Sequence, residues 1–205
     1  IIIVIIGIIG FLGYKYYKTY IIKNSSEDFV DTFGKDTTDN EKKTEDTDDI
    51  AYDGVEQGDT NSTSSEGKKK QYNGFDVAGT IEIPATNVKY PVLEQYEYSP
   101  KALETSVVIL YGVGLNQVGN TTIAGHNYRN NLFFSKNKNL KIGDKIYITD
   151  STGKRLPYTI YDKFEAAEND SDYITRDTQG AIEISLTTCT DDSKARTIIL
   201  ARADA

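Results

Sequence analysis

The sequence contains one cysteine, one histidine, no tryptophan and no methionine among its 205 residues. One cysteine excludes an intrachain disulfide. One cysteine and one histidine also fall short of the four ligands that a structural zinc site needs. No glycine-rich nucleotide-binding loop and no clear organic cofactor motif is present, so we expect that no cofactor is required.

Excess positive charge is absent as well, since the net charge is −8. Residues 24–70 carry 14 acidic and 6 basic side chains, and the remainder carries 17 of each. The acidity therefore belongs to one segment, and the rest of the chain is neutral. Neither part offers a basic surface for nucleic acid, so we predict no nucleic-acid partner.

The chain has one long apolar run, residues 1–13, followed by four tyrosines interleaved with Lys15 and Lys18. Thirteen helical residues rise only ~20 Å, less than the ~30 Å hydrocarbon core of a bilayer. The tyrosines are typical of an interfacial aromatic belt. We predict an N-terminal transmembrane helix over residues 1–22 that is truncated at its start, and hence a single-pass membrane protein.

Residues 23–73 are rich in Asp, Glu, Thr, Ser, Asn and Lys and poor in apolar side chains. Such a composition buries too little apolar area to offset the entropy of the chain. We therefore predict an acidic, polar, disordered linker over this range.

Residues 74–205 read as a folded domain of short, β-rich segments. Alternating or β-branched runs, each bounded by Gly, Pro or polar residues, recur about eight times, and no long helix interrupts them. This pattern predicts a mainly β fold, a closed β-barrel of about eight strands with short helices.

Three reactive side chains stand at the ends of predicted strands. Cys189 ends the run from residue 182, Arg196 opens the next run, and His126 follows the run from residue 121. A thiol reacts as its thiolate, a histidine can take its proton, and a guanidinium can stabilise an oxyanion. Each side chain could equally have a structural role: a buried thiol, a satisfied histidine, a solvated arginine.

The order of these motifs resembles that of the sortases, the membrane-anchored cysteine transpeptidases of Gram-positive bacteria. The family's cysteine motif, Thr/Ser-Leu-x-Thr-Cys, is matched by Ser-Leu-Thr-Thr-Cys at residues 185–189, and its arginine by Arg196. The segment 119–127, which contains His126, is similar to the family's histidine segment. The similarity runs from about Val77 to Arg202, and the ordered set is more specific than any one motif.

The resemblance implies an activity. Sortases cut a Leu-Pro-x-Thr-Gly-like sorting signal near the C-terminus of a secreted protein and hold the new carboxyl end as a thioester. They then transfer it to an amine on a peptidoglycan precursor or on a pilin lysine. By this resemblance the catalytic domain, residues 74–205, lies outside the cell, at the Gram-positive cell surface.

The resemblance also implies roles for residues. Cys189 would be the nucleophile, His126 the general acid and base, and Arg196 the group that positions substrate and stabilises the oxyanion. Substrate contacts would come from Thr188, Thr187 and Ala124. Arg202 is a weaker rival to Arg196, because it stands six residues further along the same predicted strand.

The segment before the cysteine strand contains three alternating carboxylates, Glu168, Asp170 and Asp172. Alternating carboxylates sometimes bind calcium, so these residues are weak calcium candidates. The simpler interpretation is a solvated acidic loop.

Two other functions fit the same residues. A thiol hydrolase would use them to release the acyl group to water, and a membrane-tethered binding module would keep the fold without chemistry. The order His before Cys is the reverse of that in papain-like enzymes. The sequence also lacks the Asp-Pro-aromatic lid motif that pilin-polymerising sortases often carry.

Overall fold

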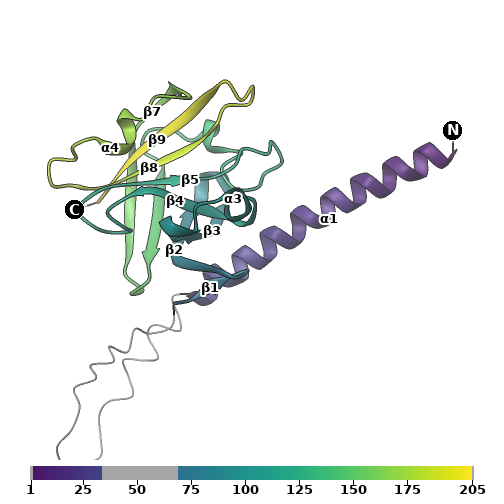
Figure 1. Ribbon diagram of the computed structural model, residues 1–205, viewed down its shortest axis with the longest axis horizontal. Coiled ribbons are helices and arrows are strands. Elements are labelled where there is room, and N and C mark those ends of the chain that lie inside the picture. The colour runs from purple at the N-terminus through teal and green to yellow at the C-terminus, as the bar shows by residue number, and fades with distance from the viewer. Residues whose placement is uncertain (1, 34–68, 205) are drawn as a thin grey trace, which may run out of the picture.

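Eight strands close into one barrel, as the sequence predicts. In the computed structural model, which describes residues 2–33 and 69–204, neighbouring strands follow the order β2-β3-β4-β5-β8-β9-β7-β6. β2 also pairs with β6, which closes the sheet on itself (Figure 1). The strands are β2 (Phe75–Ile83), β3 (Val88–Leu93), β4 (Val107–Gly112), β5 (Gly119–Ala124), β6 (Lys145–Asp150), β7 (Arg155–Ala167), β8 (Ile182–Cys189) and β9 (Ala195–Ala203).

Alternate side chains of these strands fill the barrel interior. Ile81 and Ile83 of β2 and Ile146 and Ile148 of β6 are all fully buried in the main apolar cluster. Successive strand residues point to opposite faces, so an apolar residue at every second position gives one continuous inner face. Each buried isoleucine contributes about 1.5–3 kcal/mol relative to an exposed one.

Most neighbouring strands are antiparallel, but β3–β4 and β5–β8 are parallel. In the parallel β5–β8 pair the register runs from Gly119 opposite Ile182 to Ala124 opposite Thr187. The carboxyl ends of β5 and β8 therefore meet at the same end of the barrel.

The helices that connect the strands are short, as predicted. Helix α3 begins after Ser99, whose Oγ accepts a hydrogen bond from the backbone N–H of Ala102 at 3.2 Å, and Pro100 occupies its first turn. A two-residue strand pairs with the start of β2 outside the barrel. These elements are β1 (Gln71–Tyr72), η1 (Pro84–Thr86), η2 (Gln95–Glu97), α3 (Pro100–Thr105), η3 (Asn137–Asn139) and α4 (Asp172–Thr175).

One long helix, α1 (Ile2–Phe33), precedes the barrel and extends away from it (Figure 1). Its C-terminal end packs against the barrel: Phe33 is buried in a cluster with Tyr72 and Val77. The ring of Phe29 lies 5.2 Å from that of Tyr72, edge on. This contact joins the end of α1 to the first two strands.

The structure contains the predicted N-terminal helix but does not support its prediction as a transmembrane helix. Residues 2–22 are helical, but none of the described helices, α1 included, has an apolar stretch long enough to cross a membrane. The apolar run ends at Gly13, and Lys15 and Lys18 follow it within two turns.

The structure also differs from the predicted linker at both ends. Residues 23–33 belong to α1, and residues 71–72 form β1. Phe29 and Phe33 stand one helical turn apart, so both reach the barrel surface and order this end of the segment. Residues 34–68 of the predicted linker lie outside the described residues.

Candidate active site

Three strands bring the predicted catalytic side chains to one end of the barrel. The last paired residues of parallel β5 and β8 are Ala124 and Thr187, and His126 and Cys189 each stand two residues further along. Because β8 and β9 are antiparallel, Cys189 is paired directly with Arg196. Strand register alone therefore juxtaposes a thiol, an imidazole and a guanidinium from distant parts of the sequence.

All three side chains line one open groove with a volume of about 370 Å³. The residues predicted to contact substrate, Ala124, Thr187 and Thr188, line it as well. Leu103, next to the end of α3, and Tyr173, in α4, add apolar surface. A groove that is partly apolar and carries reactive groups at one place can hold a short peptide segment next to the thiol.

A glycine fixes the backbone just before the histidine. A Cβ atom on Gly125 would lie 2.7 Å from the Phe134 ring and 2.9 Å from a methyl group of Val107, so no larger residue fits. The backbone N–H of Phe134 donates a hydrogen bond to the carbonyl of His126 at 3.1 Å. Close packing and this hydrogen bond hold His126 where β5 ends.

The environment of His126 favours a neutral imidazole. The side chain is half-buried, and this burial lowers its pKa below the ordinary value of 6.5, while the carboxylate of Glu104 opposes the shift. Its ring lies 4.7 Å from the ring of Tyr128. At neutral pH, His126 can therefore accept a proton from a thiol or an amine.

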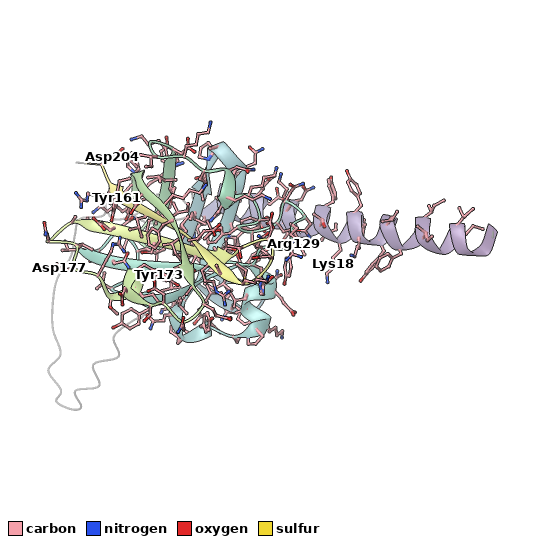
Figure 2. The ribbon with its side chains drawn as sticks, turned by 90° about the horizontal axis from the view of Figure 1, so that it is seen from above. Lys18, Arg129, Tyr161, Tyr173, Asp177 and Asp204 are labelled. Atoms are coloured by element: carbon pink, nitrogen blue, oxygen red, sulfur yellow. The ribbon has the colours of Figure 1, made fainter. Side chains whose placement is uncertain are left out.

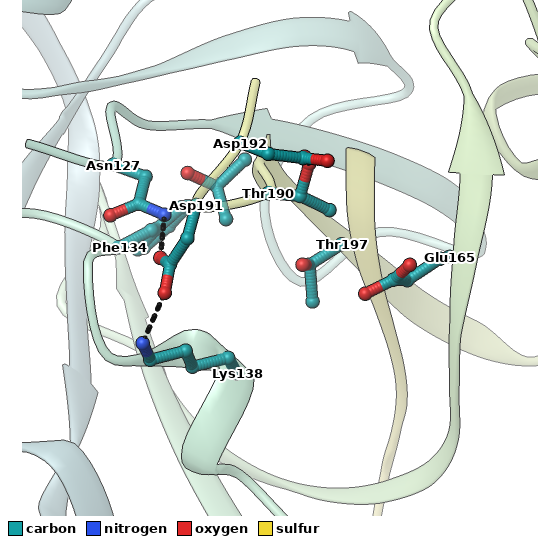
Figure 3. Close-up of a pocket in the computed structure, with 9 residues that line it drawn as sticks. Asn127, Phe134, Lys138, Glu165, Thr190, Asp191, Asp192 and Thr197 are labelled. Atoms are coloured by element: carbon teal, nitrogen blue, oxygen red, sulfur yellow. Dashed lines mark hydrogen bonds and ion pairs between the residues drawn. The ribbon is translucent and has the colours of Figure 1, made fainter. Parts of the chain in front are cut away.

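Cys189 is a half-buried free thiol, and its backbone is tied to the histidine segment by Asn127. The Asn127 Nδ2 donates hydrogen bonds to the Cys189 carbonyl at 3.0 Å and to the Asp191 carboxylate at 2.9 Å. Asp191 also pairs with Lys138 (Figure 3). Asn127 was not predicted as a site residue, and its only signal in the sequence is its position beside the only histidine.

A second cavity of about 300 Å³ adjoins the groove, shown in Figure 3. Thr188 lines both, is 4% exposed, and has a buried Oγ1 that lacks a hydrogen-bond partner among the described residues. Thr190 and Thr197 line the cavity with it. Thr188, the residue before Cys189 in β8, therefore belongs to the walls of both hollows.

The guanidinium of Arg196 is held by an acid from the β7–β8 connection. Its Nη2 donates to Oε1 of Glu168 at 2.7 Å, and the Glu168 side chain is 70% exposed. An exposed ion pair of this kind is weak. A substrate carbonyl or carboxylate can therefore displace Glu168 and accept the hydrogen bonds of the guanidinium.

Arg202, the weaker candidate for this role, lies far along β9 from the thiol. It is paired across the sheet with Glu183, six residues before Cys189, and its Nε donates to the Glu183 carboxylate at 2.8 Å. Arg202 does not line the groove.

The three calcium candidates do not gather into a metal site. Glu168 contacts Arg196, and a carboxylate oxygen of Asp170 accepts the backbone N–H of Asp172 at 3.0 Å. Within residues 2–33 and 69–204, no group of three or more His, Cys, Asp or Glu side chains could hold a metal ion.

The arrangement can support acyl transfer through a thioester. His126 can take the thiol proton, the Cys189 thiolate can attack a carbonyl held in the groove, and Arg196 can hydrogen-bond the oxygen that becomes negative. A protonated His126 can then give its proton to the departing amine.

Comparison with known proteins identifies the family and the fold of the barrel. Residues 81–204 match the model of the sortase domain. Sortase A of Corynebacterium diphtheriae, in a lid mutant, has a TM-score of 0.58 and 25% identity, covering 64% of this chain and 72% of its own. The sortase D5 transpeptidase of Clostridium perfringens has a TM-score of 0.60 and 21% identity, and the match covers 91% of this chain and 99% of the other.

Sortase C1 of Streptococcus agalactiae, in complex with MTSET, has a TM-score of 0.56 and 19% identity, covering 62% of this chain and 69% of its own. No curated protein matches the sequence. The similar structures span the A, C and D classes, so they do not select one subclass. The family model covers more than half of the chain, and the protein belongs to the sortase family.

Proposed function

We propose that this protein is a cysteine transpeptidase. It cleaves a Leu-Pro-x-Thr-Gly-like sorting signal near the C-terminus of secreted proteins, keeps the acyl group as a thioester on Cys189, and transfers it to an amine. The acceptor amine belongs to a cell-wall precursor or to a pilin, and the reaction anchors proteins at the Gram-positive cell surface. The single observation that carries the proposal is the strand register that sets Cys189 beside His126 and opposite Arg196.

Cys189 and Arg196 each have one role in this reaction, and His126 has two. His126 removes the thiol proton, the Cys189 sulfur attacks the scissile carbonyl, and Arg196 stabilises the oxyanion. The leaving amine takes its proton from His126. Thr187 and Thr188 line the groove on the side of β8 and contact the sorting signal.

The test uses the full chain, because α1 packs against the barrel through Phe29 and Phe33. The protein is incubated with a library of Leu-Pro-x-Thr-Gly-like peptides, with and without an added amine, and products are read by intact mass. The choice of probe is supported by Clostridium perfringens sortase C, whose structure was determined with the C-terminal cell wall sorting motif. We expect a thioester adduct that passes to the amine.

Cys189→Ala is the control, and it must form no adduct while retaining the fold. Cleavage that ends only in hydrolysis would favour the thiol hydrolase. Absence of an adduct with every peptide of the library, or residual cleavage by Cys189→Ala, would contradict the assignment of Cys189 as nucleophile.

A further inference from the structure

A second and larger groove, of about 680 Å³, lies between α1 and the barrel. The groove that contains Cys189 is called the first groove below. Its helix wall includes Lys15 and Lys18, and its barrel wall includes Glu104 and Tyr128. The catalytic roles described above use none of these four residues. Figure 2 shows Lys18 projecting from α1 where the helix leaves the barrel.

The two grooves are lined by neighbouring residues near His126. Leu103 lines the first groove, and the next residue, Glu104, lines the second. Likewise His126 lines the first groove and Tyr128 the second, with their rings 4.7 Å apart. The second groove is therefore bordered by Tyr128, whose ring lies against the imidazole that borders the first groove.

The second groove has opposite charges on its two walls. Glu104 is exposed, and its carboxylate partly offsets the lowering of the His126 pKa by burial and adds to the rise that burial causes in the pKa of Tyr128. On the α1 wall, Lys18 makes no ion pair within the described residues, and the Lys15 ammonium lies 5.0 Å from the ring of Phe11. A ligand with a cationic and an anionic group would be complementary to both walls.

We propose that this second groove binds the acyl acceptor, with its ammonium next to Glu104 and an anionic group of the same molecule toward Lys15 and Lys18. The inference rests on the proposed transpeptidase function and names the acceptor class as a zwitterionic amine. Glu104 and Lys18 act in binding, while His126 remains the base.

The transfer step balances with the groups present. The bound ammonium first loses one proton to water and becomes a neutral amine. Its nitrogen then forms a C–N bond with the thioester carbonyl carbon, the C–S bond breaks, and the electron pair stays on the Cys189 sulfur. A second proton of the amine moves to His126, which leaves a thiolate beside an imidazolium.

The test separates acceptor binding from acylation. The full chain is first acylated with a peptide that forms a thioester, and transfer is then measured against the concentration of triglycine or triglycine amide. Glu104→Gln should raise KM for both acceptors about tenfold, because a hydrogen bond to a charged group contributes on that scale. Thioester formation and its hydrolysis should not change. Glu82→Gln, an acidic position that lines neither groove, is the matched control.

The second part of the test concerns the anionic group of the acceptor. The unchanged protein should prefer triglycine, which keeps its carboxylate, over triglycine amide, and Lys18→Gln should remove this preference. Glu104→Asp, which keeps the charge, should retain most of the affinity for the amine.

Three results would overturn the proposal. An unchanged acceptor KM in Glu104→Gln would overturn it alone, with the transpeptidase function intact. Slower thioester formation in Glu104→Gln would show that Glu104 acts through His126 and not on the acceptor. A failure of the unchanged protein to form any thioester would overturn the proposed function, and this inference with it.

Discussion

The two ends of strand β8 hold charged groups in opposite ways. Near the N-terminal end of β8, the Glu183 side chain is 1% exposed and accepts hydrogen bonds from three side chains. Arg176 donates to it at 2.5 Å, Arg202 at 2.7 Å, and the Tyr161 hydroxyl at 2.8 Å. Burial raises the pKa of Glu183, but these donors outweigh that effect and keep the pKa below its ordinary value of 4.5.

At the other end, Cys189, His126 and Arg196 are only half-buried. Among the residues that the structure describes, the guanidinium has one ionic partner, the exposed Glu168. The imidazole ring lies against the ring of Tyr128. A group with all its partners in place is structural, whereas a group with an easily displaced partner is available to a substrate. One strand therefore carries a stabilising charge cluster at Glu183 and a reactive site at Cys189, six residues apart.

The largest effect should follow from changing the arginine at the reactive end. Arg196→Lys should lower the rate of thioester formation about 10²-fold, because an ammonium lacks the planar fork that holds an oxyanion. Arg202→Lys is the matched control at the other end of β9, and it should leave this rate unchanged. Near-full activity of Arg196→Lys, with loss in Arg202→Lys, would reverse the assignment.

A change at Glu183, at the other end of β8, should instead alter the stability of the fold. Glu183→Gln should lower the free energy of unfolding by about 2 kcal/mol, because it leaves Arg176 without its charged partner in a buried setting. Urea denaturation measures this change. The more exposed pair of Glu82 with Arg155 serves for comparison, and Glu82→Gln should have only a small effect. Equal losses in both variants would remove the distinction between the two ends.

The activity that depends on His126 and the stability that depends on Glu183 should also be lost at different pH values. His126 works as a base when neutral, so thioester formation should fall as pH drops through its lowered pKa, about tenfold for each unit below it. The stability from Glu183 is present above its unfolded pKa, near 4.5, and is lost as pH falls through the lower folded value. Activity should therefore fall at a higher pH than the Glu183 contribution. Rates that rise below pH 6 would contradict this order.

The smallest effect should come from Glu168, the displaceable partner of Arg196. Glu168→Gln should raise the efficiency of thioester formation by about two- to threefold, because an exposed ion pair contributes little. Asp172→Asn, a neighbouring acid without contact to the arginine, should change nothing. A large loss of activity in Glu168→Gln would instead give Glu168 a part in substrate binding.

The barrel and the three reactive residues could be predicted from the sequence for a simple reason. Each of His126, Cys189 and Arg196 stands at the end of a β-rich run, and strand ends are what the pairing of β5, β8 and β9 brings together. The number of strands followed from period-two burial, as in Ile81 and Ile83.

What escaped prediction depends on contacts between distant loops. Asn127 holds Cys189 through a backbone carbonyl, and no pattern in the sequence identifies such a partner. The role of Glu168 was hidden for the same reason, because an acid in a polar loop looks solvated until its arginine is placed. The packing of α1 did leave a signal, the helical spacing of Phe29 and Phe33, within a segment that composition alone assigned to a linker.

The cluster at the end of α1 has a consequence for how the helix and the barrel stay together. Phe33, the last residue of α1, and Tyr72, in β1, lie in the same apolar cluster, and Lys70 Nζ donates to the Phe33 carbonyl at 2.7 Å. The end of the helix is therefore held to the barrel by side-chain packing and by a hydrogen bond to a backbone carbonyl.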